Sequence, residues 1–339
     1  MKILLYTEGI KKIGISGLGK AVEHQISALE DNGINYSLNP KEIGLCDIVH
    51  INFYGFKSYF LAKKAHKLGK KVVYHAHSTE EDFKNSFILS NKVSKIFKWW
   101  ISKCYRLGDV IITPTEYSKR LLLNYNLNKK IFAISNGIDT NFFKYNEEYA
   151  KEFRKQYGYK KNDKVIMGVG LYLKRKGILD FVELARRMPE YKFIWFGYLD
   201  LKYVPKEIKD AINTKLPNLI FAGYVEPINL RKAYSGANLY LFPTLEETEG
   251  IPILEAMCEG IPTLVRDIPV FEEYKDGIDV YKARNIDDFE IKIRNILEEK
   301  LPSLKEQAQK HAKEKDIKLV GKKLIEVYNK VIENNWKGE

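Results

Sequence analysis

The sequence is poor in cysteine and has no long apolar run, and both absences exclude classes of protein. Three cysteines, Cys46, Cys104 and Cys258, occur in 339 residues, and no two of them form a CxxC pair. This spacing argues against a disulfide framework or a zinc site and predicts a reducing, cytoplasmic location. No segment approaches the roughly eighteen consecutive apolar residues of a spanning helix, and the apolar start at 3–6 is too short for an export signal. Any membrane contact is therefore expected to be peripheral.

Positive charge is concentrated in the first half of the chain. Residues 1–140 hold 21 Lys and Arg against 12 Asp and Glu, a net charge of +9, whereas the remainder holds 35 against 32, a net charge of +3. Such an excess attracts nucleic acid, anionic lipid or an acidic substrate, and it equally fits a well-solvated lysine-rich surface. Composition alone leaves these alternatives open.

Short apolar runs alternate with helix-length segments along the whole chain. The runs are Ile3–Tyr6, Ile48–Asn52, Val72–His75, Val110–Thr113, Ile131–Ser135, Val165–Gly170, Phe193–Gly197, Leu219–Gly223, Leu239–Phe242, Thr263–Val265 and Val280–Ala283. Continuous apolar strands indicate sheets covered by helices on both faces, so the pattern predicts an α/β fold with two doubly wound parallel sheets. Because Thr140 to Asp163 contains no such run, we expect one domain over 1–140 and a second over 141–318, which face a cleft. We also expect an amphipathic helix over 319–335, which could pack back on the first domain.

Two glutamates form the most distinctive motif. Glu247 and Glu255 follow the run that ends at Phe242, in the sequence EETEGIPILE. Gly250 lets the backbone approach a ligand, and a helix beginning near Ile251 offers N–H groups to an anion or a sugar. Carboxylates can also accept paired hydrogen bonds from vicinal hydroxyls. The alternative is that these glutamates merely favour a helix N-terminus.

A cationic loop follows the first apolar run of the second half. Lys174, Arg175 and Lys176 lie between that run and Gly177. Three cations at a strand end suit a diphosphate whose negative charge grows as it leaves, and we single out Lys176 and Arg175 for this role. A solvated loop is the other interpretation.

The first half offers two weaker motifs. The segment from Ser16 to Lys20, which includes Gly17, resembles a glycine-rich anion loop before a helix expected to begin near Ala21, but it lacks GxGxxG spacing. His75 and His77 end the third apolar run, where they could face a sugar or be structural. A metal site is not expected, because a third ligand is missing.

Residues 83–106 form an unusual basic and aromatic segment. It contains six cations, Trp99 and Trp100, and no acidic residue. This composition is typical of an interfacial helix at an anionic membrane surface. The alternatives are an apolar face that belongs to the core, or a nucleic-acid groove, which no recognised binding motif supports.

Together these motifs resemble the retaining glycosyltransferases of family 4, which have the GT-B fold. The main match is the family's E-x7-E element, met here as Glu247 and Glu255. Further matches are the segments Asn136–Asp139, Phe221–Val225, Ala237–Pro243 and Gly260–Pro262. The resemblance implies that Glu255 binds ribose hydroxyls, that Glu247 binds the transferred sugar, and that backbone at Gly250 and Ile251 meets the donor.

The resemblance also assigns the remaining motifs. It implies that Lys176 and Arg175 bind the diphosphate, that Gly17 faces donor and acceptor, and that His77 lies near the reacting sugar. One departure is Leu171, at a position where the family commonly has arginine. Lys174 or Arg175 could supply the missing charge.

More narrowly, the segments Lys2–Gly9, His75–Phe83 and Lys98–Trp100 resemble bacterial diglycosyl-diacylglycerol synthases. This implies transfer of glucose or galactose from a UDP-sugar to monoglucosyl-diacylglycerol, with no cofactor and no nucleic acid, at the inner face of the cell membrane through residues 83–106. Alternatives are a teichoic-acid, polysaccharide or protein-linked sugar as acceptor, a sugar-nucleotide epimerase, or a basic binding module. The last would leave the two glutamates unexplained.

Overall fold

The protein, in a computed structural model that describes residues 1–9 and 17–334, consists of two compact units. The first comprises residues 1–81, 92–137 and 315–339, and the second comprises 82–91 and 138–314. The short segment 82–91 belongs to the second unit although it lies in the chain between elements of the first. The C-terminal helix belongs to the first unit.

The first unit is built on a parallel sheet with the strand order β2-β1-β3-β4-β5-β6. Its strands are β1 (Lys2–Tyr6), β2 (Asn35–Ser37), β3 (Ile48–Ile51), β4 (Lys71–His75), β5 (Val110–Thr113) and β6 (Lys130–Ala133). Alternate side chains enter two separate cores, as Ile48 and Val49 show, because successive residues of a strand point to opposite faces. The sequence pattern missed β2, which is a partly exposed edge strand without an apolar run.

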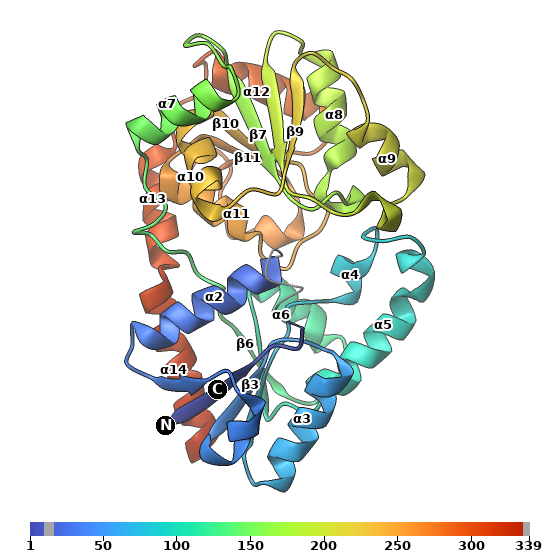
Figure 1. Ribbon diagram of the computed structural model, residues 1–339, viewed down its shortest axis with the longest axis vertical. Helices are drawn as coiled ribbons and strands as arrows, with labels where there is room; N and C mark the ends of the chain where they lie inside the picture. Colours follow the sequence, from blue (N-terminus) through green and yellow to red (C-terminus); the bar gives the residue numbers. More distant parts are fainter. Residues whose placement is uncertain (10–16, 335–339) are drawn as a thin grey trace. The chain divides into compact units, whose positions relative to one another are not determined.

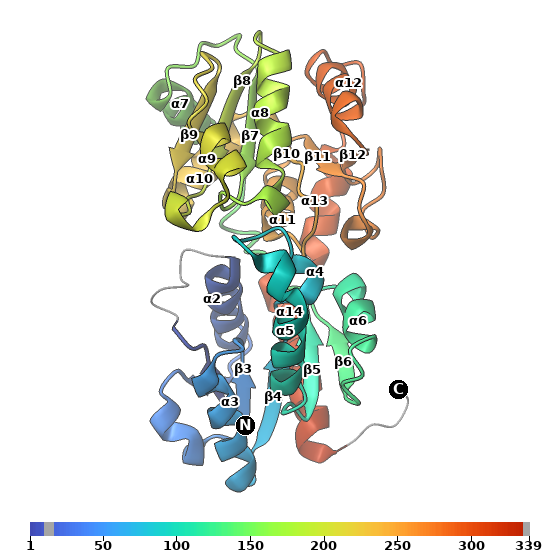
Figure 2. The same ribbon diagram turned by 90° about the vertical axis from the view of Figure 1, so that its right-hand side faces the viewer.

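Helices cover both faces of this sheet (Figures 1 and 2). One core contains residues of α2 (Gly17–Glu30) and α14 (Ile317–Glu333), and the other contains residues of α3 (Phe56–Lys67), α5 (Ser90–Tyr105) and the helix α6 (Glu116–Leu123) with its following turn. The short elements are η1 (Pro40–Leu45) and α4 (Glu80–Phe83). The amphipathic helix expected near the C-terminus is therefore present as α14.

The second unit repeats the architecture with the strand order β12-β11-β10-β7-β8-β9. Its strands are β7 (Val165–Val169), β8 (Lys192–Phe196), β9 (Leu219–Gly223), β10 (Leu239–Phe242), β11 (Thr263–Arg266) and β12 (Tyr281–Ala283), all parallel. Its helices are α7 (Glu147–Gln156), η2 (Lys174–Lys176), α8 (Ile178–Arg187), η3 (Leu201–Tyr203), α9 (Lys206–Ile212), α10 (Pro227–Gly236), α11 (Ile251–Glu259), η4 (Pro269–Phe271), α12 (Ile286–Leu297) and α13 (Lys305–Glu314). The predicted α/β fold with two parallel sheets is confirmed.

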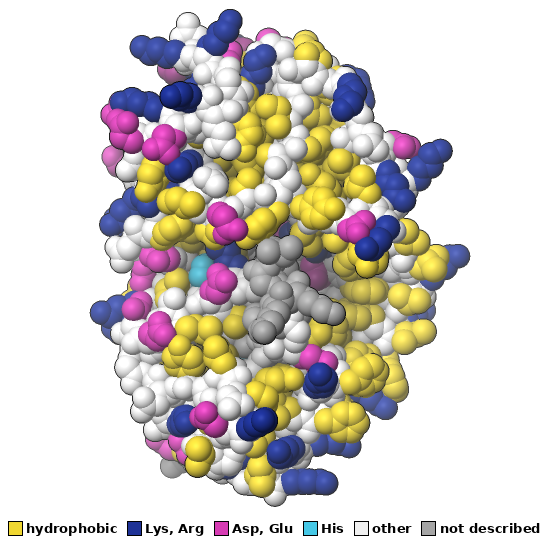
Figure 3. Space-filling view, in the orientation of Figure 1, with side chains coloured by type: hydrophobic (Ala, Val, Ile, Leu, Met, Phe, Trp, Pro, Cys, Tyr) yellow, Lys and Arg dark blue, Asp and Glu magenta, His cyan; other side chains and the backbone are white. Residues whose placement is uncertain are grey.

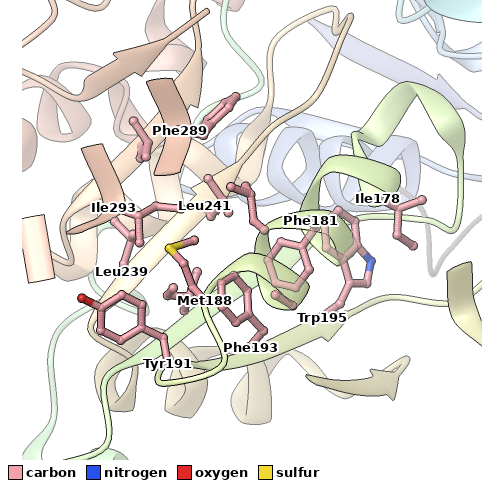
Figure 4. Close-up of a cluster of buried hydrophobic side chains, with 14 of the residues drawn as sticks. Ile178, Phe181, Met188, Tyr191, Phe193, Trp195, Leu239, Leu241, Phe289 and Ile293 are labelled. Carbon is pink, nitrogen blue, oxygen red and sulfur yellow. The ribbon is translucent and has the colours of Figure 1, made fainter. Parts of the chain in front are cut away.

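The core of the second unit is packed between its sheet and the helices α8, α9 and α12. Figure 4 shows Phe181 of α8 beside Phe193 and Trp195 of β8, with Phe289 and Ile293 of α12 at the other end of the cluster. The Phe181 ring meets those of Phe193 and Trp195 edge-on, with centroids 5.4 and 5.0 Å apart. Such aromatic packing joins α8 to β8.

Two predicted helices differ from the observed ones. Helix α2 begins at Gly17 and not near Ala21, so Gly17 and Gly19 lie in its first turn, and the rest of the predicted glycine loop, residue 16, lies outside the described residues. Residues 83–106 are not one helix, because α4 ends at Phe83 and α5 begins only at Ser90. Positive φ angles at Asn85 and Leu89 turn the chain between them, which a continuous helix cannot accommodate.

Candidate active site

The cationic loop and the acidic motif lie at the point where the strand order of the second sheet reverses. The order corresponds to 3-2-1-4-5-6 counted from β7, so β7 and β10 are neighbours although their connections run in opposite directions. Open α/β sheets bind ligands beyond the carboxyl ends of strands at such a point. The turn η2 follows β7, and the acidic motif follows β10.

Gly177 and Thr244 hold these two loops together. Gly177 has a φ of 74°, and a Cβ atom added there would lie 2.1 Å from the carbonyl oxygen of Pro243, so only glycine allows this approach. The Thr244 hydroxyl lies 3.0 Å from the Arg175 carbonyl oxygen and 2.9 Å from Glu247 Oε1. The backbone N–H of Leu245 also donates to the Arg175 carbonyl.

Arg175, Lys176 and Glu247 form an ionic cluster in which Arg175 and Glu247 are buried and Lys176 is partly buried. Lys176 Nζ lies 2.5 Å from Glu247 Oε1, and Arg175 Nη1 lies 3.4 Å from Glu247 Oε2. Burial opposes ionisation of Glu247, but the positive charges of Lys176 and Arg175 outweigh it and hold the pKa of the carboxyl below its usual value. Burial, helped by Arg175, lowers the pKa of Lys176 despite the attraction of Glu247. With Asp82, which lies 3.0 Å from Arg175, the cluster contains two cations and two carboxylates.

The segment 82–91 completes the surroundings of Arg175. The guanidinium of Arg175 contacts Asp82 at 3.0 Å and donates to the Ser86 hydroxyl at 3.1 Å. The backbone N–H of Arg175 donates to the carbonyl of Asn85. Burial lowers the pKa of Arg175, but Asp82 and Glu247 more than offset this and raise it. Lys174, in contrast, is half-buried and pairs with Glu207 at 3.2 Å. Arg175 is therefore the better candidate for the charge missing at Leu171.

The helix α11 presents the other glutamate. Gly250 has a φ of 92° immediately before the helix, so α11 begins at Ile251, as the sequence predicted, and its first N–H groups lie at the end of the Glu247 loop. Glu255 is buried and accepts a 2.8 Å hydrogen bond from the Tyr234 hydroxyl. This contact fixes one carboxylate oxygen and orients the side chain.

One turn further along α11, Glu259 is buried in a more neutral setting. It accepts a hydrogen bond from Ser235 at 2.9 Å, and Arg231 lies 3.6 Å away. Burial raises the pKa of Glu259 to about 7, because these contacts only partly offset the loss of water. Glu259 therefore titrates near neutral pH, unlike Glu247.

The first unit carries a different cluster at the ends of β3 and β4. His50 and Asn52 come from β3 and its end, and His75 and His77 come from β4 and its end. The rings of His75 and His77 stack with centroids 3.9 Å apart, and His77 Nε2 lies 3.0 Å from Asn52 Oδ1. Burial lowers the pKa of His50 and of His77 to about 3 and that of His75 well below its usual value, so all three rings are neutral at pH 7.

Close polar contacts link the rings of this cluster to α2 and α14. Gln25 Nε2 lies 2.8 Å from His75 Nδ1, and His50 Nε2 lies 3.2 Å from the same nitrogen. His50 Nδ1 lies 2.6 Å from the Tyr328 hydroxyl. A chain of hydrogen-bonding groups thus runs from α14 to His75.

Three polar atoms of this cluster are buried without a partner among the described residues. They are Gln25 Oε1, Asn52 Nδ2 and His75 Nε2. Unpaired buried polar groups are costly and point to a bound water or ligand group at such places. Gly17, the other predicted residue of this unit, is exposed at the start of α2. The described residues contain no cluster of His, Cys, Asp or Glu arranged to hold a metal ion.

Sequence reasoning identified the charged residues of the second unit but missed their supports. Asp82, Thr244 and Tyr234 carry no motif, and only their position beside strand ends could have drawn attention to them. In the first unit it missed His50 and Tyr328, although the alternation of His50 with Asn52 on one face of β3 was a usable signal.

Comparisons with known proteins identify the class of enzyme. Residues 150–315 match the family described as glycosyl transferases group 1, and residues 42–142 match glycosyltransferase family 4. The chain is 38% identical over 336 residues to the processive diacylglycerol alpha-glucosyltransferase of Acholeplasma laidlawii, covering 98% of this chain and 99% of that one. The chain therefore belongs to glycosyltransferase family 4 and is a glycosyltransferase, which confirms the predicted family.

A second relative is more distant. It is the alpha-galactosylglucosyldiacylglycerol synthase of Streptococcus pneumoniae, 26% identical, with 75% of this chain and 73% of that one covered. Among solved structures, Anabaena Alr3699/HepE in complex with UDP and glucose has a TM-score of 0.77 at 18% identity, covering 97% of this chain and 99% of that one. Sucrose-phosphate synthase of Thermosynechococcus elongatus has a TM-score of 0.71 at 15% identity, with 96% and 80% covered. These likenesses support the predicted GT-B fold.

Proposed function

We propose that this enzyme transfers glucose or galactose from a UDP-sugar to a membrane glycolipid, monoglucosyl-diacylglycerol, with retention at the anomeric carbon. The observation that carries the donor half is the ionic cluster of Arg175, Lys176 and Glu247 beyond the neighbouring strands β7 and β10. Two cations close together suit a diphosphate, and neighbouring carboxylates suit sugar hydroxyls. The acceptor half is supported by relatives named as glycosyltransferases of diacylglycerol lipids.

The proposed donor site uses each charged residue differently. Lys176 and Arg175 bind the diphosphate, Glu247 accepts from the hydroxyls of the transferred sugar, and Glu255 accepts from the ribose. The backbone at Gly250 and Ile251 meets the donor where α11 begins. The hydrogen bond from the Tyr234 hydroxyl orients the Glu255 carboxylate.

The proposed chemistry needs no protein nucleophile. The bond between the anomeric carbon and the diphosphate oxygen breaks, a bond to the acceptor oxygen forms on the same face, and the acceptor proton passes to the leaving phosphate. Lys176 and Arg175 stabilise the negative charge that develops on the diphosphate. In the first unit, Gly17 and the neutral His77 are assigned to the reacting sugars, where uncharged hydrogen-bonding groups suit hydroxyls.

We also propose that the enzyme binds the inner face of the cell membrane through the segment 83–106. Among the described residues no helix is both long and apolar enough to cross a bilayer. Helix α5 nevertheless exposes Val93, Ile96 and Trp99 beside lysines. Tryptophan and lysine together are typical of residues at a bilayer interface.

The test is a product analysis. Purified enzyme is incubated with UDP-glucose or UDP-galactose and monoglucosyl-diacylglycerol in vesicles containing phosphatidylglycerol, and products are identified by mass and linkage. We expect a diglycosyl lipid with an α linkage from one of the two donors. A lipid product with a β linkage, or no lipid product from either donor, would contradict the proposal. Donor incubated alone separates transfer from epimerisation.

Donor binding gives a second test with a matched control. Glu255→Gln is expected to weaken UDP binding about tenfold, because a ribose contact to a charged acceptor is lost. Glu259→Gln, one turn along the same helix, is expected to leave UDP affinity unchanged. Calorimetric titration with UDP measures both, and equal affinities in the two variants would remove Glu255 from the proposed site.

A further inference from the structure

Helices α3 and α5 each expose large apolar side chains. The buried residues of α3 are small, namely Ser58, Ala62 and Ala65, whereas α5 buries Ile101 and Tyr105 besides Ser94 and Ser102. The side chains of Phe56 and Phe60 on α3 are 69% and 63% exposed, and those of Ile96 and Trp99 on α5 are 66% and 55% exposed. A helix that faces water normally has the opposite arrangement.

The two exposed faces are parts of one surface of the first unit. Trp100 lies between them, because its ring centroid is 4.8 Å from that of Phe56 and 6.5 Å from that of Trp99. Its indole N–H donates to the carbonyl of Tyr54 at 2.7 Å, which fixes the ring in place. In Figure 3 apolar side chains gather at the lower right, over α3 and α5 of Figure 1. We call this surface the α3/α5 face, and it comprises Phe56, Phe60, Val93, Ile96 and Trp99.

Lysines predominate among the charged residues around the α3/α5 face, and the exception is Glu8, whose carboxylate accepts from the backbone N–H of Ser58 at the start of α3. No acidic residue occurs between residues 48 and 79 or between 83 and 108. Exposed lysines flank the apolar side chains on both helices, and they are Lys57, Lys63, Lys64, Lys67, Lys92, Lys95 and Lys103. Lys103 Nζ lies over the Trp99 ring at 4.1 Å from its centroid. A surface with apolar rings at its centre and an edge rich in lysine is complementary to an anionic bilayer.

We infer that α3 and α5 bind an anionic bilayer together, with Phe56 and Phe60 entering the headgroup region beside Ile96 and Trp99. This inference rests on the proposed glycolipid function for its biological setting and adds a second helix to the predicted segment. Helix α3 contributes two of the five apolar side chains of the face and four of the seven flanking lysines. The enzyme is thereby held by two helices whose relative position the core of the first unit fixes.

The decisive experiment compares α3 with an equally exposed control. Full-length enzyme is mixed with vesicles of equimolar phosphatidylglycerol and phosphatidylcholine, and the bound fraction is measured by flotation. The double variant Phe56→Ser, Phe60→Ser is expected to reduce partitioning about tenfold. The control is Leu45→Ser, Leu123→Ser, whose side chains are 70% and 56% exposed in the same unit. Its partitioning should equal that of the parent.

A second measurement, of fluorescence at α3, reports contact with the bilayer directly and needs no variant that weakens vesicle binding. The native cysteines are all buried, so an environment-sensitive fluorophore can be attached at Phe60→Cys. Its emission is expected to shift to the blue with these vesicles, whereas the same label at Leu45→Cys should not respond. Unchanged partitioning of the double variant, or no shift at position 60, would overturn the inference. The inference would also be overturned if the double variant lost a dimer in sedimentation but kept its vesicle binding, because the α3/α5 face would then bind a second copy of the chain.

The outcome can be separated from that of the proposed function. Transfer to monoglucosyl-diacylglycerol is also measured in detergent micelles, where no bilayer is needed. Absence of transfer by the parent enzyme in micelles contradicts the proposed reaction, whatever the vesicle results. If transfer in micelles is normal and the α3 variant binds vesicles as the parent does, only the role of α3 at the bilayer is contradicted.

Discussion

The two units place chemically different groups beyond the carboxyl ends of strands in similar parallel sheets. Beyond β7 and β10 the second unit concentrates charge, with Arg175 and Lys176 paired to Glu247. At the ends of β3 and β4 the first unit buries neutral rings and amides, with His75 and His77 stacked. A charged cluster suits a diphosphate, and a neutral one suits sugar hydroxyls. The shared fold thus sets where a ligand binds, and the local side chains set which ligand.

The charged cluster should carry the largest effect. Lys176→Ala removes the cation nearest Glu247 and is expected to lower kcat by about 10²–10³-fold, the loss typical when one group that stabilises developing charge is removed. Lys174→Ala, two residues away, should stay close to the parent because Lys174 pairs with Glu207. Steady-state kinetics with thermal unfolding as a folding check measure both. Similar kcat values for the two variants would contradict the assignment.

The close approach of the two loops should be nearly as sensitive. Gly177→Ala adds a Cβ atom 2.1 Å from a backbone oxygen, so the cationic turn must move, and we expect activity to fall roughly tenfold or more. Gly158→Ala has a similar φ of 70° but open space around it. It should cost only the left-handed backbone strain of about 1 kcal/mol. Retained activity in Gly177→Ala would show that the loop position is not critical.

Acid should affect the two units in opposite directions. Because burial lowers the folded-state pKa of His50 and His77 to about 3, stability is lost as pH falls from about 6.5, by roughly 2 kcal/mol per histidine at pH 5. Burial raises the pKa of Glu259 to about 7, so its destabilising effect grows from about pH 4.5 to 7 and disappears in acid. Amide hydrogen exchange at pH 5 and 7.5 should show that β3 and β4 are less protected from exchange in acid and that α11 is more protected. Glu259→Gln should abolish only the second change.

The smallest effect concerns the hydrogen-bond chain of the first unit. Tyr328→Phe removes the hydroxyl that is hydrogen-bonded to His50 and leaves a buried ring nitrogen unpaired, which should cost about 1–2 kcal/mol of stability. We expect the KM for the acceptor to rise a few-fold while the KM for the UDP-sugar stays constant. Tyr274→Phe, whose buried hydroxyl has no partner among the described residues, is the control. A raised donor KM in Tyr328→Phe would contradict the division of roles between the units.

The sequence allowed much of the fold and the charged half of the site to be predicted. Continuous apolar runs identified most strands, because a strand covered on both faces needs apolar side chains throughout. The cationic loop and the acidic motif could be recognised because both follow such runs. The exposed strand β2 and the break in 83–106 were missed, since neither an edge strand nor a left-handed turn at Leu89 has a strong local pattern.

What the sequence by itself determined is therefore local: the alternation of strands and helices, the amphipathic α14 and the motifs at strand ends. Only the tertiary structure decided which of these meet. It brings Lys176 to Glu247 across 71 residues and Tyr328 to His50 across 278. It also places the phenylalanines of α3 at the surface and buries the small residues of that helix. Strand order and the return of the C-terminal helix set these contacts, and both depend on packing the whole chain and not on the preferences of any one segment.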